Sequence, residues 1–157
     1  MQVFRTLAVV TLFTAGCFAS DSYAGSDRDR SALHKTSEGI LAAFARGDIE
    51  GILAYHHPAV VKALAYNKFL SGREALRADL TETLGRVRLE WLENHVESMW
   101  VQGDTAVEMT SFSIRGTPKS GEQPFVIKGR AMVVYVRYKQ SPTGWASVRE
   151  VVQPGPQ

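Results

Sequence analysis

The side chain with the clearest chemical potential is Glu150, a carboxylate at a position where period-two alternation predicts the apolar face of a strand. Burial disfavours the charged form of a carboxylate and raises its pKa, so such a group can act as a general acid or base near neutral pH. Alternatively, Glu150 is a structural carboxylate bound to Asn94, Tyr135 or a backbone amide. A shift of the strand by one residue would replace it with Arg149, which would suit an anionic ligand.

A second candidate cluster is the stretch Tyr55-His56-His57-Pro58, which follows a predicted short helix. His56 and His57 are adjacent, so both rings cannot easily bind one metal ion from a regular element, and no His-x-His pair stands nearby. We therefore predict no metal site, and a solvated histidine pair that caps the helix end. The predicted ligand-binding residues are Tyr55, His56, Asn94, Tyr135 and Glu150.

The sequence lacks the motifs of several other classes of function. The sequence has no Ser-His-Asp order, nucleophile elbow or phosphate-binding loop, so no catalytic residue is assigned and no cofactor is predicted. The formal net charge is +2 and the two signs are interspersed, which gives no basic surface for nucleic acid.

Helical spacing of apolar residues predicts a helix from Asp29 to Arg46. Gly47 should end it, and Asp48 should cap a short helix from Ile49 to Tyr55. A third helix is expected to begin within residues 71–74 and to end at Gly85.

The chain after Gly85 is strand-like. Strands are predicted at Val87–Val101, Thr105–Ile114, Pro124–Tyr138 and Trp145–Gln153. A tight hairpin turn is expected at Gly103-Asp104, and Ala59–Ala65 favours a further short strand. Three helices followed by a four-stranded meander predict an α+β domain.

Alternation along these strands predicts two different sheet faces. The inner, apolar face is expected to hold Leu92, Asn94, Val96, Ser98, Trp100, Val107, Met109, Ser111, Ile127, Ala131, Val133, Tyr135, Val148, Glu150 and Val152. The outer face is expected to hold Glu93, His95, Glu97, Glu108, Lys128, Arg130, Met132, Val134, Val136 and Arg149. The apolar middle of the outer face, at Met132, Val134 and Val136, predicts a homodimer interface. Trp91, Trp100 and Trp145 are expected in the core or an interface.

The order of elements resembles the nuclear transport factor 2-like superfamily, which includes SnoaL-like and ketosteroid-isomerase-like proteins and is also called the cystatin-like α+β cone. Four stretches carry the resemblance: residues 43–52, 71–76, 103–107 and 144–145. It implies N-terminal helices packed in the concave face of a curved antiparallel sheet. Ketosteroid isomerase, scytalone dehydratase, SnoaL-like cyclases and kinase association domains share this fold, so the fold alone does not fix the chemistry.

The resemblance also shows which residues of this sequence stand at the catalytic positions of ketosteroid isomerase. The resemblance places Ile40 at the oxyanion-hole tyrosine, Ala63 or Leu64 at the general base, and Val133 or Val134 at the second acid. None of these side chains donates or accepts a proton, so isomerase chemistry is not expected.

Three functions follow as hypotheses. The first is a domain that binds a small apolar or amphipathic molecule. The second is a lyase, isomerase or hydrolase that uses Glu150 with Tyr135 or His56. The third is a dimeric protein-interaction module with a filled cone.

Residues 1–24 are predicted to be a signal peptide, because Arg5 precedes an apolar run, Thr6–Phe18, that is too short to span a bilayer. Ser22-Tyr23-Ala24 offers small residues for cleavage. A lipoprotein anchored through Cys17 is the alternative. The mature chain would be periplasmic or secreted, without a transmembrane segment, with its domain at residues 25–153 and a disordered tail at residues 154–157.

Overall fold

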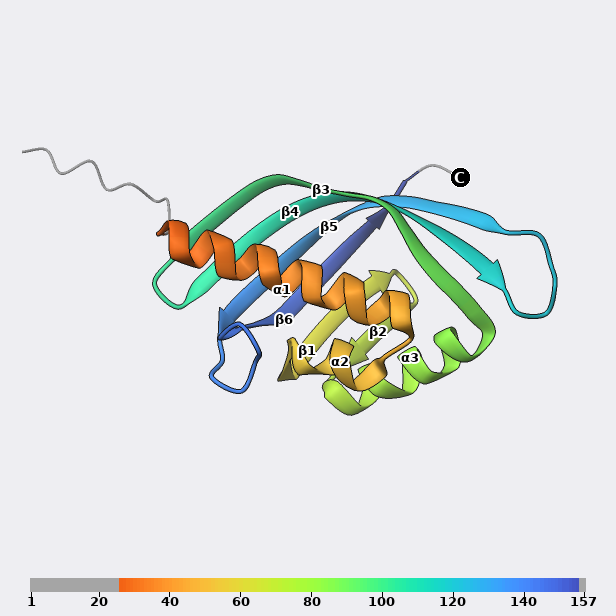
Figure 1. Cartoon of the computed structure of the whole chain (residues 1–157), viewed down its shortest axis with the longest axis horizontal. Helices are drawn as coiled ribbons and strands as arrows, with labels where there is room; N and C mark the ends of the chain where they lie inside the picture. Colours follow the sequence, from red (N-terminus) through yellow and green to blue (C-terminus); the bar gives the residue numbers. More distant parts are fainter. Residues whose placement is uncertain (1–25, 156–157) are drawn as a thin grey trace, which may run out of the picture.

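The computed structural model describes residues 26–155, in which three helices lie against a six-stranded sheet (Figure 1). The helices are α1 (Asp27–Arg46), α2 (Ile49–Ala54) and α3 (Arg73–Arg86). The strands are β1 (His56–Ala65), β2 (Lys68–Ser71), β3 (Val87–Gln102), β4 (Thr105–Pro118), β5 (Phe125–Arg137) and β6 (Trp145–Pro154). The predicted α+β class, with helices on the concave face of a curved and mostly antiparallel sheet, is confirmed.

The strand order is β2-β1-β6-β5-β4-β3. The predicted meander from β3 to β6 is present, and its pairs are antiparallel. The sheet also contains β1 and β2, an antiparallel hairpin whose first strand runs parallel to β6. The sequence predicted only part of β1, because the pairing with β6 joins segments that are far apart along the chain.

The predicted helix ends are confirmed by their caps. Gly47 has a φ of 65°, a left-handed conformation that glycine adopts without steric cost, and its N–H donates to the carbonyl of Phe44 at 2.9 Å. Oδ1 of Asp48 accepts a hydrogen bond from the N–H of Gly51 at 2.8 Å. These two residues turn the chain so that α2 follows α1 at once.

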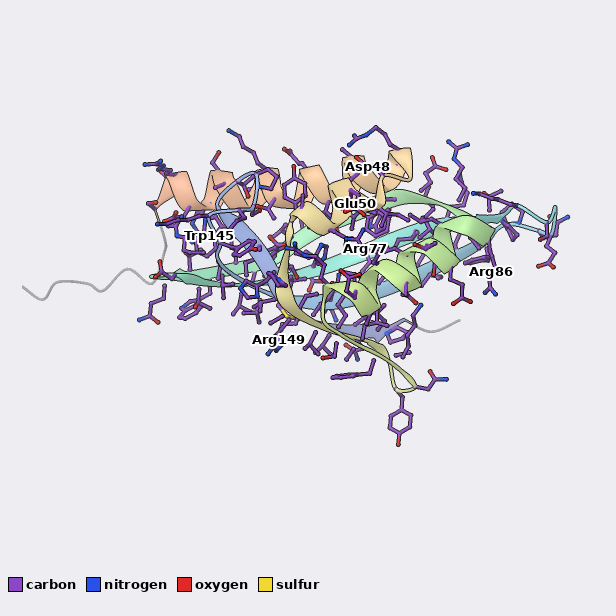
Figure 2. All side chains as sticks on the ribbon, turned by 90° about the horizontal axis from the view of Figure 1, so that it is seen from below. Asp48, Glu50, Arg77, Arg86, Trp145 and Arg149 are labelled. Carbon is purple, nitrogen blue, oxygen red and sulfur yellow. The ribbon has the colours of Figure 1, made fainter. Side chains whose placement is uncertain are left out.

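Two apolar clusters hold α1 against the rest of the fold. Near its N-terminus, Leu33 packs with sheet residues that include Tyr135 and Trp145, all nearly inaccessible to solvent. Figure 2 shows Trp145 on the side of the sheet that faces α1. Near its C-terminus, Ala43 packs with residues of α2, β1 and α3. The helix is therefore fixed at both ends above the inner face of the sheet.

The predicted faces of β3 and β4 are partly wrong. Val101 pairs with Ala106 across the Gly103-Asp104 turn, and Met99 therefore pairs with Glu108. Glu108 lies on the inner face, which places Val107, Met109 and Ser111 on the outer one.

Two β-bulges in β3 explain why alternation failed there. They lie between Trp91 and Glu93 and between Val96 and Ser98, and each changes which residues face inward. Asn94 faces the helices as predicted. Leu92 and Trp100 do not, and they are 40% and 38% exposed.

The predicted inner face of β5 is confirmed, because Ala131, Val133 and Tyr135 are buried. In β6, Glu150 pairs with Val133 as predicted, but a bulge displaces Val148 and places Ser147 opposite Tyr135. The strand continues through Pro154, and the N–H of Gly155 donates to the carbonyl of Lys128 at 2.8 Å. Pro154 of the predicted tail thus belongs to β6, and Gly155, which follows the strand, is hydrogen-bonded to β5.

The predicted signal peptide and Cys17 lie outside the described residues. Within residues 26–155, no helix combines the length and the apolar character that crossing a membrane requires.

Candidate functional site

A cavity of about 370 Å³ lies between the helices and the inner face of the sheet. Most of its surface is apolar, and its lining includes Ile40, Leu41, Phe44, Leu64, Leu76, Leu80, Leu89, Trp91, Phe112, Ile114, Ala131, Val133 and Val152. The rings of Phe44 and Trp91 contact one another, with centroids 4.7 Å apart. Phe125 and Ile127 also line the cavity yet are 41% and 45% exposed, so the cavity is open to solvent on their side.

The polar lining residues follow the register of the sheet. Lys62 pairs with Glu150, Glu150 with Val133, and Val133 with Glu108, which forms one row across four strands. In the adjacent row His56 pairs with Ser147, and Ser147 with Tyr135. Because all of these residues line the cavity, its sheet wall carries a polar patch within an otherwise apolar surface.

Glu150 faces the cavity and forms an ion pair with Lys62. The two side chains are only 18% and 12% exposed. Arg149 points to the other side of the sheet (Figure 2), where its Nη1 donates to the carbonyl of Ala59 at 2.9 Å. The structure therefore decides the register in favour of Glu150, with Lys62 as a partner that the sequence did not predict.

Glu108 is the second carboxylate in the cavity, and it is 1% exposed. The Tyr135 hydroxyl donates to its Oε1 over 3.5 Å, and its Oε2 has no hydrogen-bond partner among the described residues. Desolvation raises the pKa of Glu108 to about 7, although the Tyr135 hydrogen bond opposes the shift. Burial, and then the nearby Glu108, raise the pKa of Tyr135 well above its usual value.

The prediction of a solvated His56 is wrong, because this side chain is 1% exposed. Strand β1 begins at His56 beside β6, where the N–H of Ser147 donates to the carbonyl of Tyr55 at 2.9 Å. Nδ1 of His56 donates to the carbonyl of Ile52 at 2.8 Å, so Nε2 carries the lone pair. Desolvation and the nearby Lys62 lower the pKa of His56 to about 3, which keeps the ring neutral at physiological pH.

Four of the five predicted ligand-binding residues line the cavity: His56, Asn94, Tyr135 and Glu150. Asn94 lies at an exposed part of the lining, where its Nδ2 donates to Oγ of Ser37 at 3.4 Å. The structure does not bring Tyr55 to the cavity. Its ring packs against Gly39 of α1, where a side chain would leave no space.

Sequence reasoning missed Glu108, Lys62 and Ser147. The Gly103-Asp104 turn carried a usable signal for Glu108, because a two-residue hairpin turn pairs Val101 with Ala106 and sets the face of every residue after it. Lys62 and Ser147 carried no local signal, since one depends on the pairing of β1 with β6 and the other on a bulge.

The site can offer a shaped apolar volume and a buried polar patch to a ligand. Within residues 26–155, no three metal-ligating side chains converge. Among the described residues, five buried side-chain atoms have no hydrogen-bond partner, and three of them, His56 Nε2, Glu108 Oε2 and Ser147 Oγ, belong to residues that line the cavity. The other two, Arg73 Nε and Trp145 Nε1, lie outside the lining. Buried polar atoms are seldom left without a hydrogen bond, so these atoms are suited to contact a bound molecule.

Solved structures support the fold. A conserved protein from Planctomyces limnophilus is 22% identical, with a TM-score of 0.72 over 81% of this chain and 98% of that one. A ketosteroid isomerase-like protein from Erwinia carotovora is 13% identical, with a TM-score of 0.72 over 84% of this chain and 100% of that one. A domain of unknown function with a cystatin-like fold from Nostoc punctiforme is 17% identical, with a TM-score of 0.65 over 85% of this chain and 81% of that one.

The comparison with curated proteins gives no match. The SnoaL-like domain matches residues 38–140, which run from the middle of α1 to just beyond the end of β5 and include most of the cavity lining. The chain therefore belongs to the SnoaL-like domain family.

Proposed function

We propose that this protein binds a small, mostly apolar or amphipathic molecule in the cavity beneath α1. The single observation that carries the proposal is an open volume of about 370 Å³ with an apolar lining and a cluster of buried, unpartnered polar atoms. Volumes of roughly 300–1,000 Å³ with few polar groups are typical of ligand sites.

The cavity favours ligand binding over a filled interaction module. A filled cone would require the side chains of Trp100 and Met109 on the inner face together with Tyr135, but Trp100 and Met109 belong to the outer face. The positions aligned with the isomerase residues support a binding role too, because Ile40, Leu64 and Val133 contribute apolar surface to the cavity.

The test is a fluorescence titration with phenylnaphthylamine, an uncharged probe whose emission rises in apolar surroundings. Trp91 lines the cavity, so energy transfer from tryptophan to the probe should accompany binding. Val133→Phe places a larger side chain into the cavity and should abolish binding. Its control is Val134→Phe, the adjacent residue of β5 on the outer face. Equal binding by both variants would place the probe elsewhere.

A second candidate function is proton transfer on a bound carbon acid. Glu108, rather than the ion-paired Glu150, favours it, because a buried carboxyl with a pKa of about 7 can exchange a proton near neutral pH. The bicyclic ketone tetralone in heavy water provides a test by NMR. Faster deuterium uptake than in buffer, lost in Glu108→Gln, would support the enzyme. Uptake equal to that in buffer would leave binding as the function.

We further propose that the chain is exported after cleavage near Gly25, with a periplasmic or secreted location. The proposal is supported by the sequence of residues 1–24, which has the features of a signal peptide. N-terminal sequencing of the protein from its natural host tests it. An intact Met1 would contradict export by cleavage, and a lipidated Cys17 would favour the anchored alternative.

Finally, we propose a homodimer through the outer face of the sheet. Met132 and Val151 are paired across β5 and β6 and are 46% and 57% exposed. Together with the neighbouring Val134 and Val136 they form an apolar strip, and association of two copies would remove it from water.

A further inference from the structure

We infer that the cavity selects molecules whose polar end donates a hydrogen bond and carries no negative charge, and that Glu108 is the residue that rejects anions. This inference rests on the proposed binding function and specifies the class of ligand. It follows from how the charges of the lining residues are matched and from which buried atoms have no partner.

The charged residues that line the cavity are Lys62, Lys68, Asp79, Glu108 and Glu150. Four of them form two ion pairs. Lys62 binds Glu150, and Nζ of Lys68 lies 2.6 Å from Oδ1 of Asp79. Both lysines of the lining are thus already matched by a carboxylate. An anionic ligand would have to compete with these carboxylates for the two lysines, and displacing either carboxylate would leave it partly buried without its partner.

Glu108 is the one charged lining residue that is not in an ion pair among the described residues. The titratable groups of the cavity's polar patch are Tyr135, Glu150, Lys62 and His56, of which Tyr135 is its hydrogen-bond partner. Burial raises the pKa of Glu108 to about 7, so near neutral pH it is partly ionised. Like charges placed together in an enclosed site repel strongly, and an anion beside Glu108 is therefore disfavoured.

Two of the three unpartnered lining atoms specify the favourable group, whereas the third, Ser147 Oγ, is a hydroxyl that can donate or accept and does not discriminate. Nε2 of His56 is an acceptor, because Nδ1 donates to the carbonyl of Ile52. Oε2 of Glu108 is an acceptor whenever the carboxyl is ionised. A hydroxyl or amine on the ligand can donate to either atom, whereas a carboxylate or sulfonate offers them no proton.

The experiment compares phenylnaphthylamine with anilinonaphthalenesulfonate, which has the same skeleton and one added sulfonate. We expect the neutral probe to bind the wild-type chain at least about tenfold more tightly near pH 8, because of the like-charge repulsion. The preference should decrease toward about pH 6, as Glu108 takes up a proton.

Two isosteric variants separate the carboxylates. Glu108→Gln removes the unpaired acid and should abolish the pH dependence of the preference. Glu150→Gln leaves Lys62 without its partner, so the affinity for the sulfonate relative to that for the neutral probe should rise by roughly tenfold. Urea unfolding of each variant shows whether it is folded.

The inference is overturned if both probes bind the wild type equally and Val133→Phe abolishes both. It is also overturned if Glu150→Gln gains no affinity for the sulfonate while it still binds the neutral probe. Failure of both probes to bind the wild type removes the proposed function and this inference with it.

Discussion

The hydroxyl of Tyr135 lies 3.5 Å from Oε1 of Glu108, and the two side chains are 3% and 1% exposed. They come from neighbouring strands, β5 and β4, and share the inner face of the sheet. A carboxyl in such a place has lost most of its hydration and has one long hydrogen bond in return. Burial therefore raises the pKa of Glu108, and the hydrogen bond from Tyr135 opposes this rise only in part.

The first prediction concerns the stability of the fold with and without Glu108. The pKa of this carboxyl is raised from 4.5 to about 7 by folding, so its contribution to stability is fully present below pH 4.5 and is lost as the pH rises toward 7. Relative to Glu108→Gln, the wild type should therefore lose about 2–3 kcal/mol of unfolding free energy between about pH 5 and pH 8. Urea unfolding at both pH values measures this difference.

The same substitution at Glu93, an exposed residue of β3, controls for the removal of one carboxylate. If the difference in unfolding free energy between the wild type and Glu108→Gln stays constant with pH, folding does not raise the pKa of Glu108, and the prediction is contradicted.

The second prediction has the opposite sign and concerns His56. Folding lowers the pKa of this ring from 6.5 to about 3, so its contribution is present above pH 6.5 and is lost as the pH falls toward 3. The wild type should thus lose stability relative to His56→Gln as the pH is lowered from about 7 to about 5. NMR titration of the His56 ring offers an independent measurement, and protonation of the ring near its ordinary pKa would contradict the prediction.

The third prediction concerns the ion pair of Lys62 and Glu150. Lys62→Met leaves a largely buried carboxylate without its partner and should cost about 2–4 kcal/mol. The double variant Lys62→Met/Glu150→Gln should recover most of this loss. Arg86→Met is the matched control, because its ion pair with Glu82 is 75% and 68% exposed and should contribute less than about 1 kcal/mol. Equal losses of unfolding free energy in Lys62→Met and Arg86→Met would contradict the prediction, because they would show that the buried ion pair contributes no more than the exposed one.

The fourth prediction concerns assembly. If the outer face forms a homodimer, Met132→Glu should convert the dimer to a monomer, since a charge at the interface would have to be desolvated. Light scattering measures the mass of the wild type and the variant. Thr117→Glu, an exposed change near the distal end of β4, serves as the control. A wild-type monomer at high concentration would contradict the proposed interface.

Local sequence signals predicted most of the fold. The caps at Gly47 and Asp48 and the turn at Gly103-Asp104 are determined by residues close together in the chain, and all three appear in the structure. The same is true of the inner face of β5, where alternation is not interrupted by a bulge.

The site was harder to predict because it depends on long-range pairing and on bulges. Lys62 meets Glu150 only because β1 lies parallel to β6, a contact between residues 88 positions apart. Glu108 stands between Val107 and Met109, so its own neighbours suggested an outward position. His56 is buried because β1 begins directly after α2. The following His57-Pro58 gave no indication of a strand at this point.

A crystal structure of the protein soaked with a bromonaphthol tests the proposed binding site most directly, because anomalous scattering locates the bromine and the hydroxyl marks the polar end of the ligand. We expect a naphthol ring between Val133 and Trp91, with its hydroxyl directed toward Glu108 or His56. Bromine found only on the outer face near Met132, with the cavity free of the ligand, would contradict it.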